Sequence, residues 1–178
     1  MTDLAQTPII EWEEFSQLAV MPAEAKIASV VKSPDGRSLS ILFEGFEARC
    51  DGSGKKSAAA VLMGSIEAHL PAKTDWTATR ADFRGQVALK DGARATVELG
   101  LARAVQGETM VAPLPSDSNS VEFVRTLYSA AEYIPAKVDG DVPAYAPLTL
   151  SVQLTLSCPG NSSALAAVDS VDLELWVR

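Results

Sequence analysis

The clearest pattern in this chain is the alternation of apolar and polar residues over 148–157, LTLSVQLTLS. Aliphatic residues occupy every second position, and threonine, serine or glutamine occupies the positions between them. Successive side chains of a β-strand point to opposite faces, so the stretch predicts a strand with one buried and one solvated face. Strands of this kind are typical of antiparallel sheets.

Other segments follow the same period of two and are separated by turn signals. We predict strands over 26–32, 38–48, 58–70, 94–104 and 170–178, and a further extended stretch within 76–89 that ends in 86–89. Ser33-Pro34-Asp35-Gly36 and Lys90-Asp91-Gly92 have the residue types of tight turns. Gly45 with Phe46 predicts a bulge. The alanine-rich segment 58–70 also suits a helix by composition, but its alternation and the glycine within it favour a strand.

Four segments do not give a clear strand pattern. Residues 106–120 and 135–147 are predicted to be long, proline-containing connections. Residues 122–133 fit either a short helix or a strand followed by a turn. Residues 1–24 are expected to form an N-terminal arm, in which 11–18 is either a short helix with Trp12 and Phe15 on one face or an extended segment whose aromatic side chains dock elsewhere.

These elements predict an all-β fold. A chain of 178 residues with 47% hydrophobic content is large enough for one packed core. About eight short strands separated by turns indicate an antiparallel two-sheet sandwich. The jelly-roll and immunoglobulin-like strand orders both remain open. We expect a single domain over 25–178, preceded by the arm at 1–24.

Charge and hydropathy exclude some classes of partner. The formal net charge is −8 and the pI is about 4.6, so there is no basic surface for a phosphate backbone and nucleic acid is not expected as a partner. No apolar run has the length of a membrane span. The acidic N-terminus does not fit a signal peptide, so either the chain is not exported by that route or its leader is missing from the sequence.

Cys50 and Cys158 each end a predicted strand beside a glycine-containing turn. They are candidates for one disulfide, which would close a long loop and stabilise the fold by roughly 4–5 kcal/mol in the chain-entropy model. Two separate reduced thiols are the alternative.

The order of several segments resembles domain-of-unknown-function family four-three-six-zero. These segments are SPDGRSLSILFEGFEA (33–48), a strand ending in HLP (69–71), ADFRGQVAL (81–89), LTLSVQLTLS and AVDSVDLELWVR (167–178). Members are small, mostly secreted fungal and bacterial proteins. The resemblance implies a β-rich, non-catalytic domain and an extracellular or surface location. It implies no active-site residues. The chain departs from the pattern by lacking a leader and most of the cysteines of secreted members.

The candidate chemistry centres on Trp76, Asp82 and Arg84. Asp82 and Arg84 are two positions apart in a predicted strand, so their side chains share a face. They form either a structural ion pair or a polar anchor in a ligand cleft, with Trp76 as a stacking surface. His69 is the only histidine, and we interpret it as a surface residue. Asp139-Gly140-Asp141 lacks the remaining ligands of a calcium loop. No cofactor motif, metal site or catalytic residue is predicted.

Three functions follow from these features. The first is a non-catalytic structural or assembly subunit that self-associates or contacts another protein through Trp12, Phe15 and Trp176. The second is a module that binds a glycan or another small ligand through Trp76, Tyr128, Tyr133 or Tyr145 beside Asp82 and Arg84. The third is a hydrolase, for which no carboxylate pair has the required spacing. The sequence places the assembly subunit first.

Overall fold

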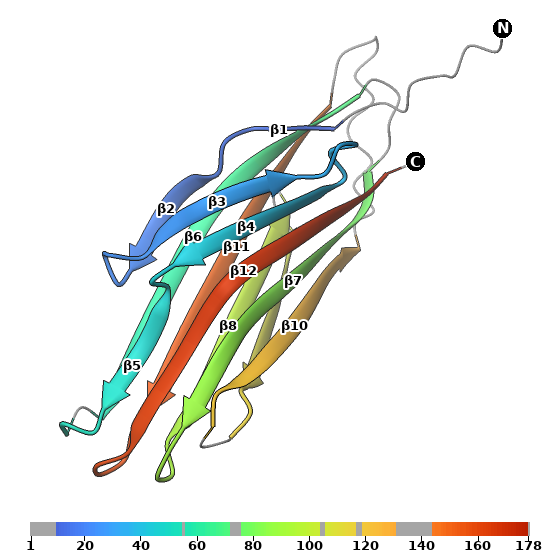
Figure 1. The fold of residues 1–178 in the computed structure, drawn as a ribbon. Helices are drawn as coiled ribbons and strands as arrows, with labels where there is room; N and C mark the ends of the chain where they lie inside the picture. The colour runs from blue at the N-terminus through green and yellow to red at the C-terminus, as the bar shows by residue number, and fades with distance from the viewer. Residues whose placement is uncertain are drawn as a thin grey trace, which may run out of the picture.

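The fold is an all-β sandwich. The structure is a computed structural model that describes residues 10–54, 56–71, 76–103, 106–116, 119–130 and 144–177. The strands in these ranges form two antiparallel six-stranded sheets that pack face to face (Figure 1). The predicted two-sheet sandwich is therefore confirmed. The described part of the chain holds no helix of the length and hydrophobicity that a membrane crossing requires.

Each sheet draws its strands from distant parts of the sequence. Sheet A consists of β1 (Glu11–Trp12), β2 (Ser16–Met21), β6 (Ser57–Leu70), β8 (Arg94–Arg103), β9 (Gln106–Pro113) and β11 (Ala144–Ser157). Its order is β1-β6-β11-β8-β9, and β2 also pairs with β6. Sheet B consists of β3 (Lys26–Lys32), β4 (Ser38–Glu44), β5 (Glu47–Asp51), β7 (Trp76–Leu89), β10 (Val121–Ala130) and β12 (Ser163–Val177). Its order is β10-β7-β12-β4-β3, and β5 also pairs with β12.

The alternating stretch 148–157 lies in β11, at the centre of sheet A. β11 pairs with β6 on one side and with β8 on the other. Its five aliphatic side chains are completely or almost completely buried between the sheets. Full burial of an aliphatic side chain contributes about 1.5–3 kcal/mol, so this strand alone supplies a large part of the hydrophobic stabilisation.

β7 and β12 form the centre of sheet B. On the far side of β12, β4 and β5 lie end to end, and the chain between them passes through Gly45 at a φ of 74° and the buried Phe46. The sequence predicted a bulge at these two residues within one strand over 38–48, whereas the structure ends β4 at Glu44 and begins β5 at Glu47. Opposite it, β12 has a register shift between Val168 and Ser170, which leaves Asp169 as the extra residue. This irregularity divides the outer surface of sheet B into an upper and a lower half.

Residues 10–21 do not form the separate arm that the sequence predicted. β1 and β2 both pair with β6 in sheet A. Trp12 is only 6% exposed, and its indole Nε1 donates a hydrogen bond to the Gly36 carbonyl oxygen. The Phe15 ring packs over Gly64, where a Cβ atom would collide with it. Trp12 is thus buried in the core and Phe15 is partly buried against it. Of the two alternatives for 11–18, the extended segment with docked aromatic side chains is correct, and Trp12 is not available to an interaction surface.

Two further predictions about secondary structure are corrected or decided. The connection predicted over 106–120 is a strand, β9, over 106–113. Of the two alternatives for 122–133, the strand is correct, because β10 covers Val121–Ala130. Residues 131–143 lie outside the described part of the chain, and with them the Asp139-Gly140-Asp141 turn and Tyr133.

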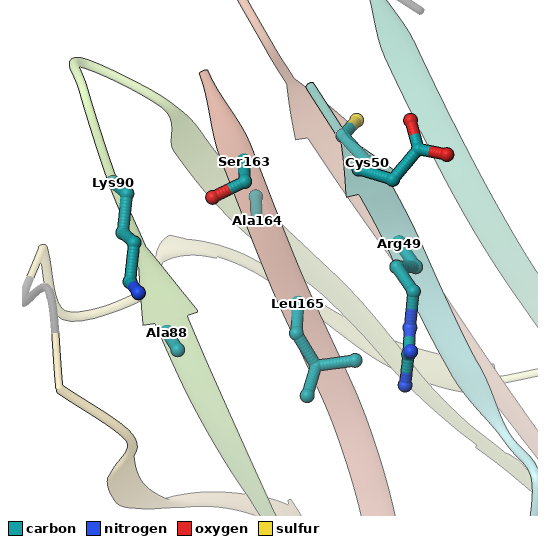
Figure 2. Close-up of a pocket in the computed structure, with 8 residues that line it drawn as sticks. Arg49, Cys50, Ala88, Lys90, Ser163, Ala164 and Leu165 are labelled. Carbon is teal, nitrogen blue, oxygen red and sulfur yellow. The ribbon is translucent and has the colours of Figure 1, made fainter. Parts of the chain in front are cut away.

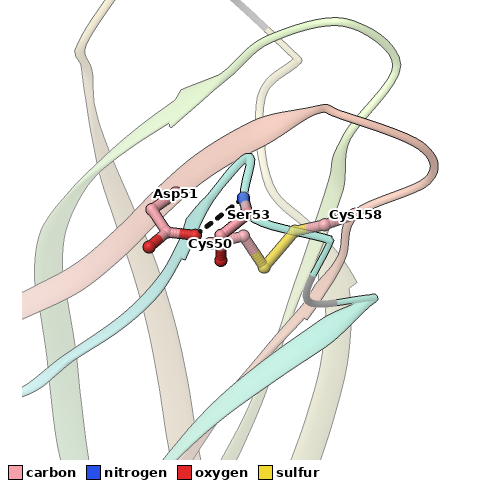
Figure 3. Close-up of a disulfide and its surroundings, with 4 residues drawn as sticks. All are labelled: Cys50, Asp51, Ser53 and Cys158. Carbon is pink, nitrogen blue, oxygen red and sulfur yellow. Dashed lines mark hydrogen bonds between the residues drawn. A yellow bond between two sulfur atoms is a disulfide. The ribbon is translucent and has the colours of Figure 1, made fainter.

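Cys50 and Cys158 form a disulfide that connects the two sheets. Cys50 lies near the end of β5 in sheet B, and Cys158 directly follows β11 in sheet A (Figure 3). Their Cα atoms are 6.6 Å apart. Beside the bond, the Asp51 carboxylate accepts a hydrogen bond from the backbone N–H of Ser53 at 2.9 Å and shapes the turn after β5. Of the two alternatives that the sequence left open, the structure therefore has the disulfide.

Candidate functional site

The outer face of sheet B carries the polar side chains of β7 together with exposed aromatic residues. Arg80, Asp82 and Arg84 alternate along β7 with the buried Ala81 and Phe83, so all three side chains lie on the solvent side. β10 and β12 flank β7, and their register sets Tyr128 beside Arg80 and Asp172 beside Asp82. This arrangement confirms that Asp82 and Arg84 share one face, as the alternation predicted.

Tyr128 and Trp176 form an exposed pair of aromatic rings at one end of this face. Their ring centroids are 6.3 Å apart with planes inclined by 53°, and the residues remain 53% and 45% exposed. They belong to β10 and β12, on opposite sides of β7. The β7 residue that pairs with Trp176 is Ala78, whose methyl group is small enough for the rings to meet above it. We call Tyr128 and Trp176 the aromatic platform.

Arg80 connects the platform to the polar centre of the face. Its guanidinium carbon lies 6.0 Å from the Tyr128 ring centroid, within the range of a cation–π contact. The same guanidinium binds Asp82 in a two-point contact, with Nε to Oδ1 at 3.1 Å and an Nη atom to Oδ2 at 2.7 Å. This hydrogen-bonded pairing with the carboxylate raises the pKa of Arg80. Arg80 therefore stays charged and is held in one orientation against the tyrosine.

Asp82 is the most enclosed charged group on the face, with only 6% of the residue exposed. Besides the Arg80 contact, its Oδ1 atom accepts a hydrogen bond from the Thr126 hydroxyl at 2.6 Å. A carboxylate removed from water is tolerated only when it is paired and hydrogen-bonded, and here both conditions are met. Asp82 thus fixes the Arg80 side chain and links β7 to β10.

Arg84 has a different main partner from the one the sequence suggested. Its Nε atom lies 2.7 Å from Asp172 Oδ2 on β12, whereas its nearest contact with Asp82 is 3.9 Å. The closer pair is thus Arg84–Asp172. The two aspartates and two arginines alternate over the centre of the face, which is consequently polar without a large net charge.

The lower end of the same face has a shallow depression of about 330 Å³ (Figure 2). Leu165 and Ala88 form its floor, and the long side chains of Arg49 on β5 and Lys90 after β7 stand on its two sides. Arg49 is paired with Glu47 at 2.9 Å. The hollow exists because small residues lie between two long ones: Ala88 and Ser163 leave space that Arg49 and Lys90 do not fill. We call this depression the lower trough.

Sequence reasoning found most of these residues but divided them between two hypotheses. Trp176 was assigned to an assembly surface, and Tyr128 to a glycan site with Asp82 and Arg84. The structure brings them onto one face. Arg80 was missed, although its position two residues before Asp82 placed it on the same side of the strand. Trp76 begins β7, but its side chain lies outside the described residues, and so does that of Tyr145.

Other candidate chemistry is limited within the described ranges. His69 is partly exposed, and its Nε2 atom lies 3.0 Å from Glu13 Oε1. Among the residues that the structure describes, no group of three or more histidine, cysteine, aspartate or glutamate side chains gathers where a metal ion would be held.

Comparisons with known proteins identify no relative in sequence. No family model matches the chain, and no curated protein does so. Among solved structures it is similar to TmCBM61 in complex with beta-1,4-galactotriose, with 11% identity, a TM-score of 0.35 and coverage of 96% of this chain and 90% of that one.

Two further solved structures show a similar degree of likeness. The first is CBM35 from Cellvibrio japonicus Abf62, with 13% identity, a TM-score of 0.32 and coverage of 94% and 96%. The second is the xylan-binding module CBM15, with 15% identity, a TM-score of 0.28 and coverage of 94% and 97%. Identities and scores this low leave the function to be argued from the residues of the chain itself.

Proposed function

We propose that the outer face of sheet B binds carbohydrate without catalysing its turnover, and that the aromatic platform is the centre of the site. The observation that carries the proposal is that Tyr128 and Trp176 are neighbours, held on a sheet surface, yet about half exposed. Contiguous exposed apolar groups with polar residues around them mark binding sites, whereas single exposed apolar residues are common on protein surfaces.

The chemistry around the platform suits sugar rings. A pyranose offers an apolar C–H face and a rim of hydroxyl groups, so it needs an aromatic surface with hydrogen-bonding groups at its edge. Arg80 supplies donors next to Tyr128, and Glu174, which is paired with Arg80 in the strand register, supplies an acceptor. Both groups project from strands, which hold them more precisely than loops would.

The carboxylates of the face serve binding rather than catalysis in this proposal. Asp82 is enclosed by Arg80 and Thr126, and Asp172 is paired with Arg84. Their role is to orient the two arginines.

Affinity gel electrophoresis tests this function. The chain is run through native gels containing a panel of soluble neutral polysaccharides: β-glucan, mannan, galactan and xylan. We expect retardation by at least one of them and loss of that retardation in Tyr128→Ala and Trp176→Ala. Val111→Ala is the matched control, because Val111 is an exposed apolar residue on the outer face of sheet A. Failure of every polysaccharide to retard the chain, or equal retardation of all variants, would contradict the proposal.

A further inference from the structure

The aromatic platform and the lower trough lie on the same face of sheet B, at opposite ends of the same two strands. Trp176 and Ala78 mark the upper end of the β12–β7 pair, and Leu165 and Ala88 mark the lower end. The outer face of these central strands, with β10 and β4 beside them, is turned toward the viewer in Figure 1. Nothing in the proposed function accounts for the trough.

The separation of the two ends follows from strand geometry. Ala78 and Ala88 both lie on the outer side of β7, ten residues apart, which corresponds to about 33 Å at the usual rise of a strand. The trough is about two strand spacings wide, roughly 10 Å, because Arg49 on β5 and Ala88 on β7 both pair with Leu165 on β12. The two ends together define a long, narrow strip rather than one compact pocket.

The side chains along this strip change in a regular order. The upper end is aromatic and the lower end is aliphatic, with the floor of Leu165 and Ala88 between two cations. Between the ends, most of the outward residues can form hydrogen bonds, namely Glu174, Arg80, Asp172, Asp82, Ser170, Arg84 and Gln86, and the buried Ala167 is the exception. Val124 on β10 and Leu42 on β4 are exposed apolar residues on the two sides of the middle section.

We infer that the ligand is an internal segment of an extended polysaccharide that lies along β7 and β12 and occupies both the aromatic platform and the lower trough. A chain of sugar rings presents apolar faces and hydroxyl groups along its whole length, which matches apolar contacts at both ends and polar contacts between them. The acids and arginines of the middle section pair with one another, so this surface offers no excess of positive charge to an anionic polymer, and we take the chain to be a neutral one.

This inference rests on the proposed carbohydrate function, but it predicts something that the platform alone does not. If one ligand occupies both ends, binding at the trough becomes intramolecular once the platform is engaged, and affinity rises with chain length. A trisaccharide is too short to extend from Trp176 to Leu165, whereas an octasaccharide of the same linkage has the reach. We expect the octasaccharide to bind at least about tenfold more tightly.

A variant that fills the trough separates the two contributions. In Ala88→Glu the new carboxylate lies between Arg49 and Lys90, where ion pairing holds it in the hollow. Ala59→Glu makes the same change at an exposed position on the outer side of β6, in sheet A, and serves as the control. The ligands are a trisaccharide and an octasaccharide prepared from the polysaccharide that retards the chain, with affinities measured by calorimetry.

The expected result is that Ala88→Glu lowers the octasaccharide affinity to that of the trisaccharide and leaves trisaccharide affinity unchanged, while Ala59→Glu alters neither. One outcome would overturn the inference of an extended ligand and leave the proposed function intact. In this outcome the trisaccharide and the octasaccharide bind the unmodified chain with equal affinity, and binding is still lost in Trp176→Ala. Equal octasaccharide affinities of Ala88→Glu and the unmodified chain would likewise overturn it. If no polysaccharide in the panel binds, both proposals fail.

Discussion

The outer faces of sheets A and B expose different side chains, although the same alternation of buried and solvated residues builds both sheets. On sheet A, the central strands β8 and β11 expose mostly threonine, serine, glutamine and alanine, with Arg94 and Glu98 as charged residues among their described outward positions. On sheet B, the central strands β7 and β12 expose a network of arginines and acids, with Trp176 at its end.

This difference shows which polar residues the fold itself requires. A strand with one wet face needs only small hydrophilic residues on that face, and β11 meets this need with hydroxyl and amide groups. Buried ion pairs and half-exposed aromatic rings are not required for a solvated sheet face, and such groups contribute little to the free energy of folding. Their concentration on one face is therefore the reason for assigning the ligand to sheet B.

The largest effect is expected from the disulfide, because it connects the two sheets whose faces are being compared. Cys50 and Cys158 are separated by 108 positions in the sequence, and a loop of about that length gives about 4.7 kcal/mol of stabilisation in the chain-entropy model. We expect the Cys50→Ser/Cys158→Ser variant to lose a large part of this free energy of unfolding in urea titrations.

The same variant distinguishes the two ends of sheet B. Cys50 lines the lower trough, whereas the aromatic platform lies about 33 Å away along β7. Trisaccharide binding should therefore survive at a temperature where the variant is folded, while the advantage of the octasaccharide should shrink. Loss of both in a folded variant would show that the two ends are not separate contact regions.

Two glycines give the next largest difference. A Cβ atom at Gly85 would collide with the Ala167 carbonyl oxygen and approach the Phe123 ring, and neither can move easily. At Gly100 on sheet A the obstacle is the Ser151 hydroxyl, which rotates away. We expect Gly85→Ala to cost about 1–3 kcal/mol and Gly100→Ala to cost less than about 1 kcal/mol in urea unfolding. Equal losses of stability in the two variants would mean that the β12 backbone at Ala167 can move away from β7 to accommodate the new methyl group.

Much of the fold was predictable from the sequence, because alternation reports burial directly. The leucines of β11 and the hairpin turn at Asp35-Gly36 are examples. The prediction failed for β1, β2 and β9, whose residues do not alternate cleanly. β2 and β9 lie at the sides of sheet A, where fewer side chains are buried, so the periodic signal is weak. Their pairing with β6 and β8 is a tertiary effect that local sequence does not contain.

The candidate site was predictable only in part, for a similar reason. Parity along β7 places Arg80, Asp82 and Arg84 on one face, and this can be read from spacing alone. Tyr128 and Trp176 are close together because β10 and β12 both pair with β7. These two strands are far apart in the sequence. The strand order was left open, so no spacing rule could join the two rings. The trough depends on the same long-range pairings.

A smaller effect is expected when Asp82, the enclosed acid at the centre of the sheet B face, is removed. Asp82→Ala leaves Arg80 and Thr126 without their shared acceptor, while Glu98→Ala removes an exposed acid from sheet A. Since the arginine remains partly in water, we expect a cost of about 1–2 kcal/mol for Asp82→Ala and almost none for Glu98→Ala in urea unfolding. Glycan affinity should fall only in Asp82→Ala, because Arg80 loses its fixed orientation beside Tyr128.

The smallest effect concerns two aspartates whose pKa values move in opposite directions. Burial and, secondly, the nearby Glu122 carboxylate raise the pKa of Asp169 at the β12 bulge in sheet B. The folded chain therefore holds this proton more tightly than the unfolded chain does. Ionised Asp169 destabilises the fold at pH values above its folded pKa. This loss of stability disappears as the pH falls from the folded pKa towards the lower, unfolded pKa. Asp169→Asn should raise the melting temperature at neutral pH and leave it unchanged in acid.

Asp35, in the turn between β3 and β4, provides the opposite case. Hydrogen bonds from the Ser33 hydroxyl and the Arg37 backbone N–H lower the pKa of Asp35. Ionised Asp35 therefore stabilises the fold at pH values above its unfolded pKa. This stabilisation is lost as the pH falls through the folded pKa. Asp35→Asn should thus lower the melting temperature at neutral pH and not in acid. Melting curves across this pH range measure both variants. Opposite signs of the two changes in melting temperature would mean that the Asp35 carboxylate stabilises the fold. They would also mean that the Asp169 carboxylate in sheet B lowers stability, so that folding does not explain its presence.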